Sequence, residues 1–121
     1  MTAKAGSHGR FDVTVKIEES TAVVALSGEL DLTHAPVLRD ALDAALEGEV
    51  SRVLIDCANL GFCDSTGLNA LLAARSTSEP KSITVELAAM QPAVARLFEI
   101  TGAIALFRTY PTASEALRAL Q

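Results

Sequence analysis

The sequence has few of the residues on which metal centres, disulfide scaffolds and membrane spans depend. It contains no tryptophan, one tyrosine, two cysteines and two histidines. No apolar run reaches about 18 to 20 residues, the length needed to cross a bilayer. The first ten residues also lack the apolar centre of a signal peptide. We therefore predict no membrane span, no membrane partner and no export.

Basic residues are also in short supply. Ten lysines and arginines stand against fifteen acidic residues, which gives a formal net charge of −5 and a sequence pI near 4.9. Binding to a phosphate backbone needs a positive surface, so we predict no nucleic-acid partner.

The two cysteines, Cys57 and Cys63, lie in a stretch that otherwise resembles a strand and a buried loop, where a free cysteine is commonly a small hydrophobic residue. His8 and His34 lie far from them in the sequence, and the spacing matches no zinc signature. We predict no metal and no cofactor, and reduced thiols without an export signal favour the cytoplasm.

What is present indicates one globular domain. Half of the 121 residues are hydrophobic, 21% are charged and the mean hydropathy is +0.31, which excludes a disordered chain. Residues 1–10 contain Gly6-Ser7-His8-Gly9 and show no periodicity, so we predict a flexible N-terminal tail there and a folded domain over residues 11–121.

The hydrophobic periodicity predicts alternating strands and helices. Predicted strands lie at residues 11–18, 21–26, 50–57, 83–87 and 105–109, and predicted helices at 33–47, 64–76, 92–101 and 112–120. Thr33 and Pro36 are expected to start the first helix and Gly48 to end it. Glu86, which alternates with apolar neighbours, is expected to face water. Thr112 and Glu115 form a capping box for the last helix.

This order of elements predicts an α/β fold. An N-terminal antiparallel hairpin leads into right-handed βαβ crossovers, which together give a mixed sheet with about four helices. Because the first and fourth predicted strands alternate between apolar and polar residues, part of one sheet face is expected to be open to water.

The most informative segment is Gly61-Phe62-Cys63-Asp64-Ser65-Thr66-Gly67-Leu68, at the turn between a buried strand and a helix. Asp64 is a helix-capping residue type, and Gly67 permits close packing, so a purely structural interpretation remains open. In a second interpretation, Ser65 is the substrate of a separate kinase. A phosphoryl group there adds about −1.5 to −2 charges, which a helix N-terminus tolerates and a partner docked on the turn does not.

Three enzymatic or phosphotransfer interpretations fit the segment poorly. A nucleophile elbow needs glycines on both sides of Ser65, and Cys63 occupies one of those positions. The lysine and glycines of a phosphate-binding loop are missing. Asp56 ends a buried strand, as a phosphoacceptor aspartate does, but the accompanying acids and lysine are absent, so we expect it to brace the following loop.

The helix after this turn has one face of small, uncharged residues. Helical spacing places Ser65, Asn69, Ala73 and Ser76 there, with Thr66 and Ala70 beside them. Alanine is the best helix former, so helix stability alone can explain these small residues. The alternative is that they form a flat surface on which a partner docks. The sequence leaves both open.

From Phe11 to Leu120 the chain resembles the STAS domain family, in the form of the anti-sigma factor antagonists. The resemblance rests on Gly28-Glu29-Leu30-Asp31, on the segment Phe62–Leu68 and on Arg96-Leu97-Phe98-Glu99-Ile100-Thr101-Gly102. It implies a bacterial partner-switching protein that is not an enzyme. In this family, the unphosphorylated antagonist binds an anti-sigma factor that is also a serine-protein kinase, and thereby releases a sigma factor.

The resemblance also assigns roles to residues. Ser65 matches the serine that the kinase phosphorylates and a serine phosphatase restores. The motif acids are matched by Asp31 and Asp64, and the second hydroxyl by Thr66; we expect these, with Gly67, Asn69 and Ala73, to bind the partner. Asp31 serves equally well as the cap of the first helix.

Departures from the family pattern border the expected docking surface, at Asn69, at Leu87-Ala88-Ala89-Met90 and at Ala103-Ile104-Ala105. They affect the identity of the partner more than the fold. The alternative function is a STAS adaptor that is never phosphorylated and holds a larger lipid-transport or signalling assembly together. In either case we expect a monomer or a weak dimer.

Overall fold

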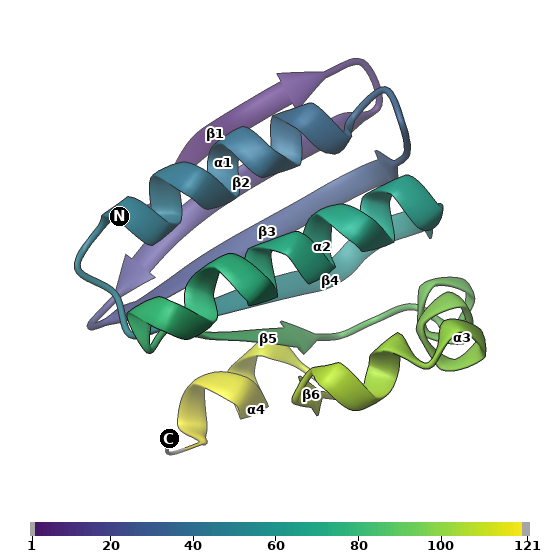
Figure 1. Ribbon diagram of the computed structural model, residues 1–121. Helices are drawn as coiled ribbons and strands as arrows, with labels where there is room; N and C mark the ends of the chain where they lie inside the picture. Colours follow the sequence, from purple (N-terminus) through teal and green to yellow (C-terminus); the bar gives the residue numbers. More distant parts are fainter. Residues whose placement is uncertain (1, 120–121) are drawn as a thin grey trace.

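The computed structural model describes residues 2–119 of the chain. In this part a six-stranded sheet has the spatial order β1-β2-β3-β4-β5-β6 (Figure 1). The strands are β1 Thr2–His8, β2 Phe11–Glu18, β3 Thr21–Leu30, β4 Arg52–Cys63, β5 Thr84–Ala88 and β6 Thr109–Tyr110. The first three strands pair antiparallel and the remaining pairs are parallel, so the predicted mixed α/β sheet is confirmed.

The described helices are α1 Ala35–Glu47, α2 Ser65–Ser78, α3 Pro92–Thr101 and α4 Ala113–Arg118, with 3-10 turns at Glu79–Lys81 and Ala103–Leu106. Helices α1 and α2 lie side by side over one face of the sheet (Figure 1). None of the described helices is long and apolar enough to cross a membrane.

The core lies between this helix pair and the sheet. Along β4, Val53 and Ile55 are fully buried in the main core, whereas Leu54 packs with Ala116 of α4 in a second cluster. Because successive strand residues point to opposite faces, α4 covers the other side of the sheet at β4 and β5.

Several predicted elements are confirmed. The β2–β3 hairpin pairs Phe11 with Gly28 and Glu18 with Thr21. Pro36 lies in the first turn of α1 and Gly48 ends that helix. Thr112 caps α4 as predicted, because its side chain accepts a hydrogen bond of 3.0 Å from the backbone N–H of Glu115.

The prediction of a flexible tail over residues 1–10 is wrong for Thr2–His8. These residues form β1, which pairs antiparallel with β2 from Thr2 opposite Lys16 to His8 opposite Phe11. An edge strand can be held by backbone hydrogen bonds alone. Because these bonds do not depend on side chains, the sequence of such a strand need not alternate between apolar and polar residues.

Glu86 does not face water as predicted. It is buried, and its Oε1 accepts a hydrogen bond of 2.8 Å from Nε of Arg52, a neighbour on the paired strand β4. The Arg52 guanidinium also contacts the Ala116 carbonyl oxygen and lies 5.7 Å from the centre of the Tyr110 ring. A buried carboxylate is tolerated here because it is paired.

Three other local predictions are corrected. The expected loop at residues 61–63 is the end of β4, and the expected strand at 105–109 consists of the Ala103–Leu106 turn followed by the two-residue β6. Thr33 does not cap α1: His34 is the N-cap residue, no side chain caps the helix, and the backbone N–H of His34 donates to the Asp31 carboxylate. Leu120, the last residue of the helix predicted over 112–120, lies outside the described residues.

Candidate functional site

Strands β3 and β4 end next to each other and place the two motif acids at one edge of the sheet. Leu30, the last residue of β3, is paired with Cys63, the last residue of β4. Asp31 and Asp64 follow directly, and the backbone N–H of Asp64 donates to the Leu30 carbonyl oxygen at 3.1 Å. The parallel register therefore brings together two residues that lie 33 positions apart in the sequence.

Asp64 is the N-cap of α2. Its Oδ1 accepts a hydrogen bond of 2.9 Å from the backbone N–H of Gly67, which satisfies one of the free N–H groups at the helix start. Ser65 is the first helical residue and is exposed, whereas Thr66 is half-buried. The turn thus presents the Ser65 hydroxyl to solvent at the positive end of the helix dipole.

Gly67 is buried where α2 crosses the end of β3. A β-carbon at this position would stand 2.6 Å from Leu30 Cγ and 2.8 Å from the Leu30 carbonyl oxygen. The structural explanation weighed for Gly67 is therefore confirmed, and the residue lies beneath the expected docking surface rather than on it.

Asp31 is held by His34, a residue for which the sequence pattern predicts no role. Its Oδ1 accepts the backbone N–H of His34 at 3.1 Å and lies 2.9 Å from His34 Nδ1. The His34 ring is buried and stacks on Phe11 with centroids 5.7 Å apart. The turn that begins α1 thereby fixes the position of the Asp31 carboxylate, and the three-residue spacing from Asp31 to His34 was the available signal.

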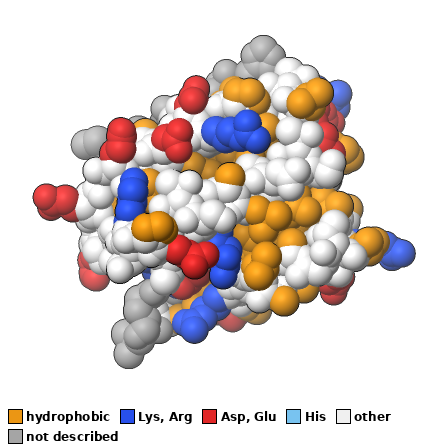
Figure 2. Space-filling model, in the orientation of Figure 1, with side chains coloured by type: hydrophobic (Ala, Val, Ile, Leu, Met, Phe, Trp, Pro, Cys, Tyr) orange, Lys and Arg blue, Asp and Glu red, His pale blue; other side chains and the backbone are white. Residues whose placement is uncertain are grey.

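The small-residue face of α2 lies largely where spacing predicted. Ser65, Asn69, Ala73 and Ser76 are exposed, but Ala70 is buried at 1% exposure and does not belong to the face. In Figure 2 the surface over the first half of α2 consists mainly of uncharged atoms.

Two exposed apolar side chains border this site and were not singled out from the sequence. Leu32 follows Asp31 and is 71% exposed, and Phe62 precedes Cys63 and is 49% exposed. Both come from the chain segments that carry the motif acids, so the expected docking surface has an apolar rim. Large apolar side chains that are left in water next to a polar site are typical of interaction surfaces.

The cysteines are buried and free. Burial raises the pKa of Cys57 to about 12, with Asp56 and then Cys63 adding to the shift; burial and Asp64 raise the pKa of Cys63 to about 12. Such thiols are poor nucleophiles. In residues 2–119 no group of three or more histidine, cysteine or acidic side chains is placed to hold a metal ion.

Asp56 does not end its strand as predicted, because β4 continues to Cys63, but its side chain braces the neighbouring backbone. Its Oδ1 accepts a hydrogen bond of 3.1 Å from the backbone N–H of Ala58, two residues on, in an irregular part of β4. This contact uses the carboxylate locally.

A family model described as "Mlab, STAS domain" matches residues 13–107. The chain belongs to the STAS domain family. It is 30% identical over 105 residues to the anti-sigma-F factor antagonist RsfB of Mycobacterium tuberculosis, covering 87% of this chain and 85% of the relative. It is 32% identical over 93 residues to an anti-sigma-B factor antagonist of Bacillus subtilis, covering 76% and 84%.

A solved structure agrees with this assignment. The crystal structure of an anti-sigma factor antagonist from Mycobacterium paratuberculosis superposes with a TM-score of 0.81 at 30% identity, and the match covers 88% of this STAS chain and 91% of that chain. The mixed sheet and its helices are therefore those of STAS structures.

Proposed function

We propose that this STAS protein is an anti-sigma factor antagonist whose binding is switched off by phosphorylation of Ser65. In the unphosphorylated form it binds an anti-sigma factor that is also a serine-protein kinase, and a sigma factor is released. A serine phosphatase restores the binding form. We further propose that the protein is not an enzyme and acts in the cytoplasm as a monomer or a weak dimer.

The observation that carries the proposal is the exposed Ser65 hydroxyl at the first position of α2, directly after its capping aspartate. A kinase needs an accessible hydroxyl, and this one requires no unfolding of the helix to be reached. The relatives named above as antagonists add support, since they align over 76% to 87% of the chain.

The switch follows from charge. A phosphoryl group at Ser65 places about −1.5 to −2 charges next to Asp64, and the single basic residue of α2, Arg75, lies in the last turn of the helix. In water this added charge is solvated and favoured by the helix dipole. Beneath a docked partner it is desolvated without a cation beside it, which costs about 3–5 kcal/mol and weakens binding by roughly a hundredfold or more.

The partner surface would consist of the motif acids Asp31 and Asp64, the half-buried Thr66, and the exposed Asn69 and Ala73 of α2. The exposed apolar side chains of Leu32 and Phe62, from the same chain segments as the two acids, extend it. A surface of two acidic and several small uncharged residues, bordered by exposed apolar side chains, suits a protein partner better than a nucleic acid.

The test is phosphorylation of the purified protein by the anti-sigma kinases of the source organism. Wild type, Ser65→Ala and Ser76→Ala are incubated with each kinase and ATP, then examined by intact mass and peptide mapping. We expect one phosphate in wild type and in Ser76→Ala, a control serine exposed on the same helix, and none in Ser65→Ala. Phosphorylated protein should bind the kinase at least tenfold more weakly.

The outcome that contradicts the proposal is equally definite. If no kinase phosphorylates Ser65 and the protein forms a stable complex with a different assembly, the antagonist role fails. The non-phosphorylated adaptor of a lipid-transport or signalling assembly would then be the better account.

A further inference from the structure

The pairing of β5 with β6 stops halfway along β5. Leu87 and Ala88 are paired with Thr109 and Tyr110, and the backbone N–H of Leu87 donates to the Arg108 carbonyl oxygen at 3.1 Å. Every second residue of a strand directs its backbone groups to the same side, so the N–H and C=O of Val85 also point toward this edge. In the described chain neither group is bonded to residues 103–108.

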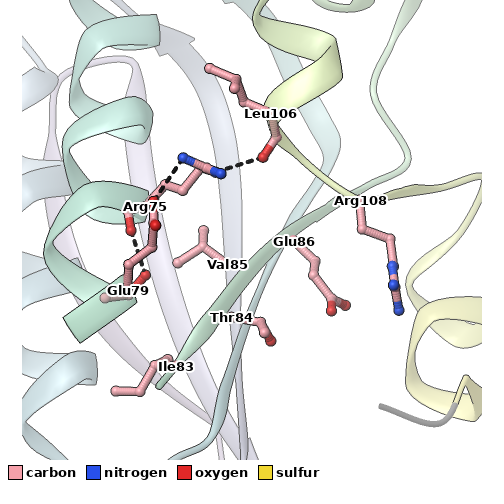
Figure 3. Close-up of a pocket in the computed structure, with 9 residues that line it drawn as sticks. Arg75, Glu79, Ile83, Thr84, Val85, Glu86, Leu106 and Arg108 are labelled. Carbon is pink, nitrogen blue, oxygen red and sulfur yellow. Dashed lines mark hydrogen bonds and ion pairs between the residues drawn. The ribbon is translucent and has the colours of Figure 1, made fainter. Parts of the chain in front are cut away.

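The acceptor that would continue the ladder has another partner. By the register of Leu87 with Thr109, the Val85 N–H would donate to the carbonyl oxygen of Leu106. That oxygen instead accepts a hydrogen bond of 2.6 Å from Nε of Arg75, at the end of α2 (Figure 3). The carbonyl oxygen that would continue the ladder is thus bonded to Arg75 and not to the Val85 N–H.

A cavity of about 560 Å³ occupies the gap between β5, the end of α2 and the segment leading into β6. This volume falls within the roughly 300–1,000 Å³ of ligand sites. Ile83 and Val85 give it an apolar floor, and Arg108 lines it from the other side of β5 (Figure 3). We refer to this cavity as the Val85 gap.

Of the charged side chains that line the Val85 gap, Arg108 has no oppositely charged partner among the described residues. Glu86 is paired with Arg52, and Arg75 is paired with Glu79 at 2.9 Å. Arg108 is exposed and forms no ion pair with the described residues. An acidic side chain therefore complements the gap.

We propose that the Val85 gap is a second interaction site, which binds an extended segment of a partner protein by strand addition to β5. The segment pairs its backbone with Val85 and places an aspartate or glutamate against Arg108. Main-chain hydrogen bonds supply affinity in this mode of recognition, and alternate side chains supply specificity. Because α2 and the turn at 103–106 enclose the gap on two sides, a single extended chain fits it and an edge strand already carrying its own sheet does not.

The Val85 gap is independent of the Ser65 site. Ser65 begins α2, Arg75 lies in its last turn, and a helix of 14 residues is about 20 Å long. A segment bound in the gap therefore stays in place when Ser65 is phosphorylated, and the inference does not depend on the antagonist role.

The first test is amide hydrogen exchange in the free full-length protein, resolved by NMR. The N–H of Val85 should exchange at least tenfold faster than that of Leu87, which lies two residues along the same strand and is bonded to Arg108. Equal protection of the two amides would mean that the gap is closed, and the proposal would be wrong.

The second test uses the peptide acetyl-Thr-Val-Glu-Val-Thr-amide as a probe in an NMR titration. The peptide should shift the Val85 and Arg108 amides and slow exchange at Val85. Binding should weaken at least tenfold with Arg108→Glu, and with a probe that has lysine in place of glutamate, but not with Arg39→Glu on the exposed face of α1. No response at millimolar peptide, equal binding by Arg108→Glu, or dimerisation through these amides without peptide would each overturn the proposal.

Discussion

Gly67 of α2 lies against Leu30 of β3 so closely that no larger residue fits between them. A β-carbon at position 67 would be 2.6 Å from Leu30 Cγ, and the backbone carbonyl of Leu30 at 2.8 Å cannot move without disturbing the β3–β4 pair. The start of α2, and with it Ser65, is therefore positioned by a contact between a glycine and the end of a strand.

Gly67→Ala should lower the free energy of unfolding by about 1–3 kcal/mol, the usual cost of overpacking a close contact. Gly48→Ala is the matched control, because a β-carbon there meets only the Ala45 carbonyl oxygen at 3.5 Å and its φ of −76° suits alanine. Urea denaturation followed by circular dichroism measures both. Wild-type stability in Gly67→Ala would contradict the packing role.

Asp64→Ala should remove the cap of α2 and cost about 0.5–2 kcal/mol, because the N–H of Gly67 loses its acceptor. Asp64→Asn keeps a side-chain oxygen at the same place and should lose only a few tenths of that. The two variants together separate capping from charge: if Asp64→Asn is stable but binds the anti-sigma factor more weakly, the carboxylate itself contacts the partner. Equal stability of Asp64→Ala and wild type in urea would exclude the capping role.

Ala73→Arg should weaken binding of the anti-sigma partner at least tenfold, about 1.4 kcal/mol, without changing stability. The residue is exposed in the middle of the small-residue face, so a long charged side chain there keeps a flat partner from closing. Ala93→Arg, at an exposed position of α3, is the control. Isothermal titration calorimetry with an anti-sigma factor that binds the wild type measures the affinity of both variants, and unchanged affinity of Ala73→Arg would remove α2 from the docking surface.

The elements that the sequence predicted well are those that bury an apolar face. Helix α1 follows from its repeating leucines and alanines, and the β2–β3 hairpin from alternation, since burial of these side chains is what stabilises the elements. Strand β1 was not predicted because it is held by backbone pairing with β2, which leaves no hydrophobic pattern in the sequence. Glu86 was misplaced because its partner Arg52 lies 34 positions away, and no local pattern reveals that pair.

The candidate site divides in the same way. Asp64 as a cap and Ser65 as the exposed first residue were predictable, since helix-start chemistry is local in sequence. The junction of Asp31 with Asp64 depends on the parallel register of β3 and β4, which only the folded sheet defines. The contact between His34 and Asp31 depends on the turn before α1 and on Phe11, which stacks on the buried imidazole.

The two buried cysteines should make the protein less stable at high pH. In the folded protein, burial raises the pKa of Cys57 and of Cys63 to about 12, whereas thiols in the unfolded chain ionise near their ordinary pKa of 9.0. Between these values the unfolded state has released its thiol protons and the folded state still holds them. The free energy of unfolding should therefore fall as pH rises from about 9 toward 12.

The measurement is a series of urea titrations across this pH range, on wild type and on the double variant Cys57→Ala with Cys63→Ala. The double variant lacks both thiols and should show a flatter pH dependence. An unchanged slope would assign the loss of stability to other groups.

Arg52 and Glu86 should contribute less to stability as a pair than the loss on removing either side chain alone suggests. Both side chains are 4% exposed, and Arg52 also contacts the Ala116 carbonyl, so it links β4, β5 and α4. Glu86→Leu leaves the guanidinium buried without a counter-charge and should cost about 3–5 kcal/mol, as should Arg52→Met.

The double variant Arg52→Met with Glu86→Leu replaces the pair by apolar side chains and should recover most of that loss. A double-mutant cycle in urea measures the coupling. If the two losses simply add, Arg52 acts through Ala116 and Tyr110 instead of through Glu86.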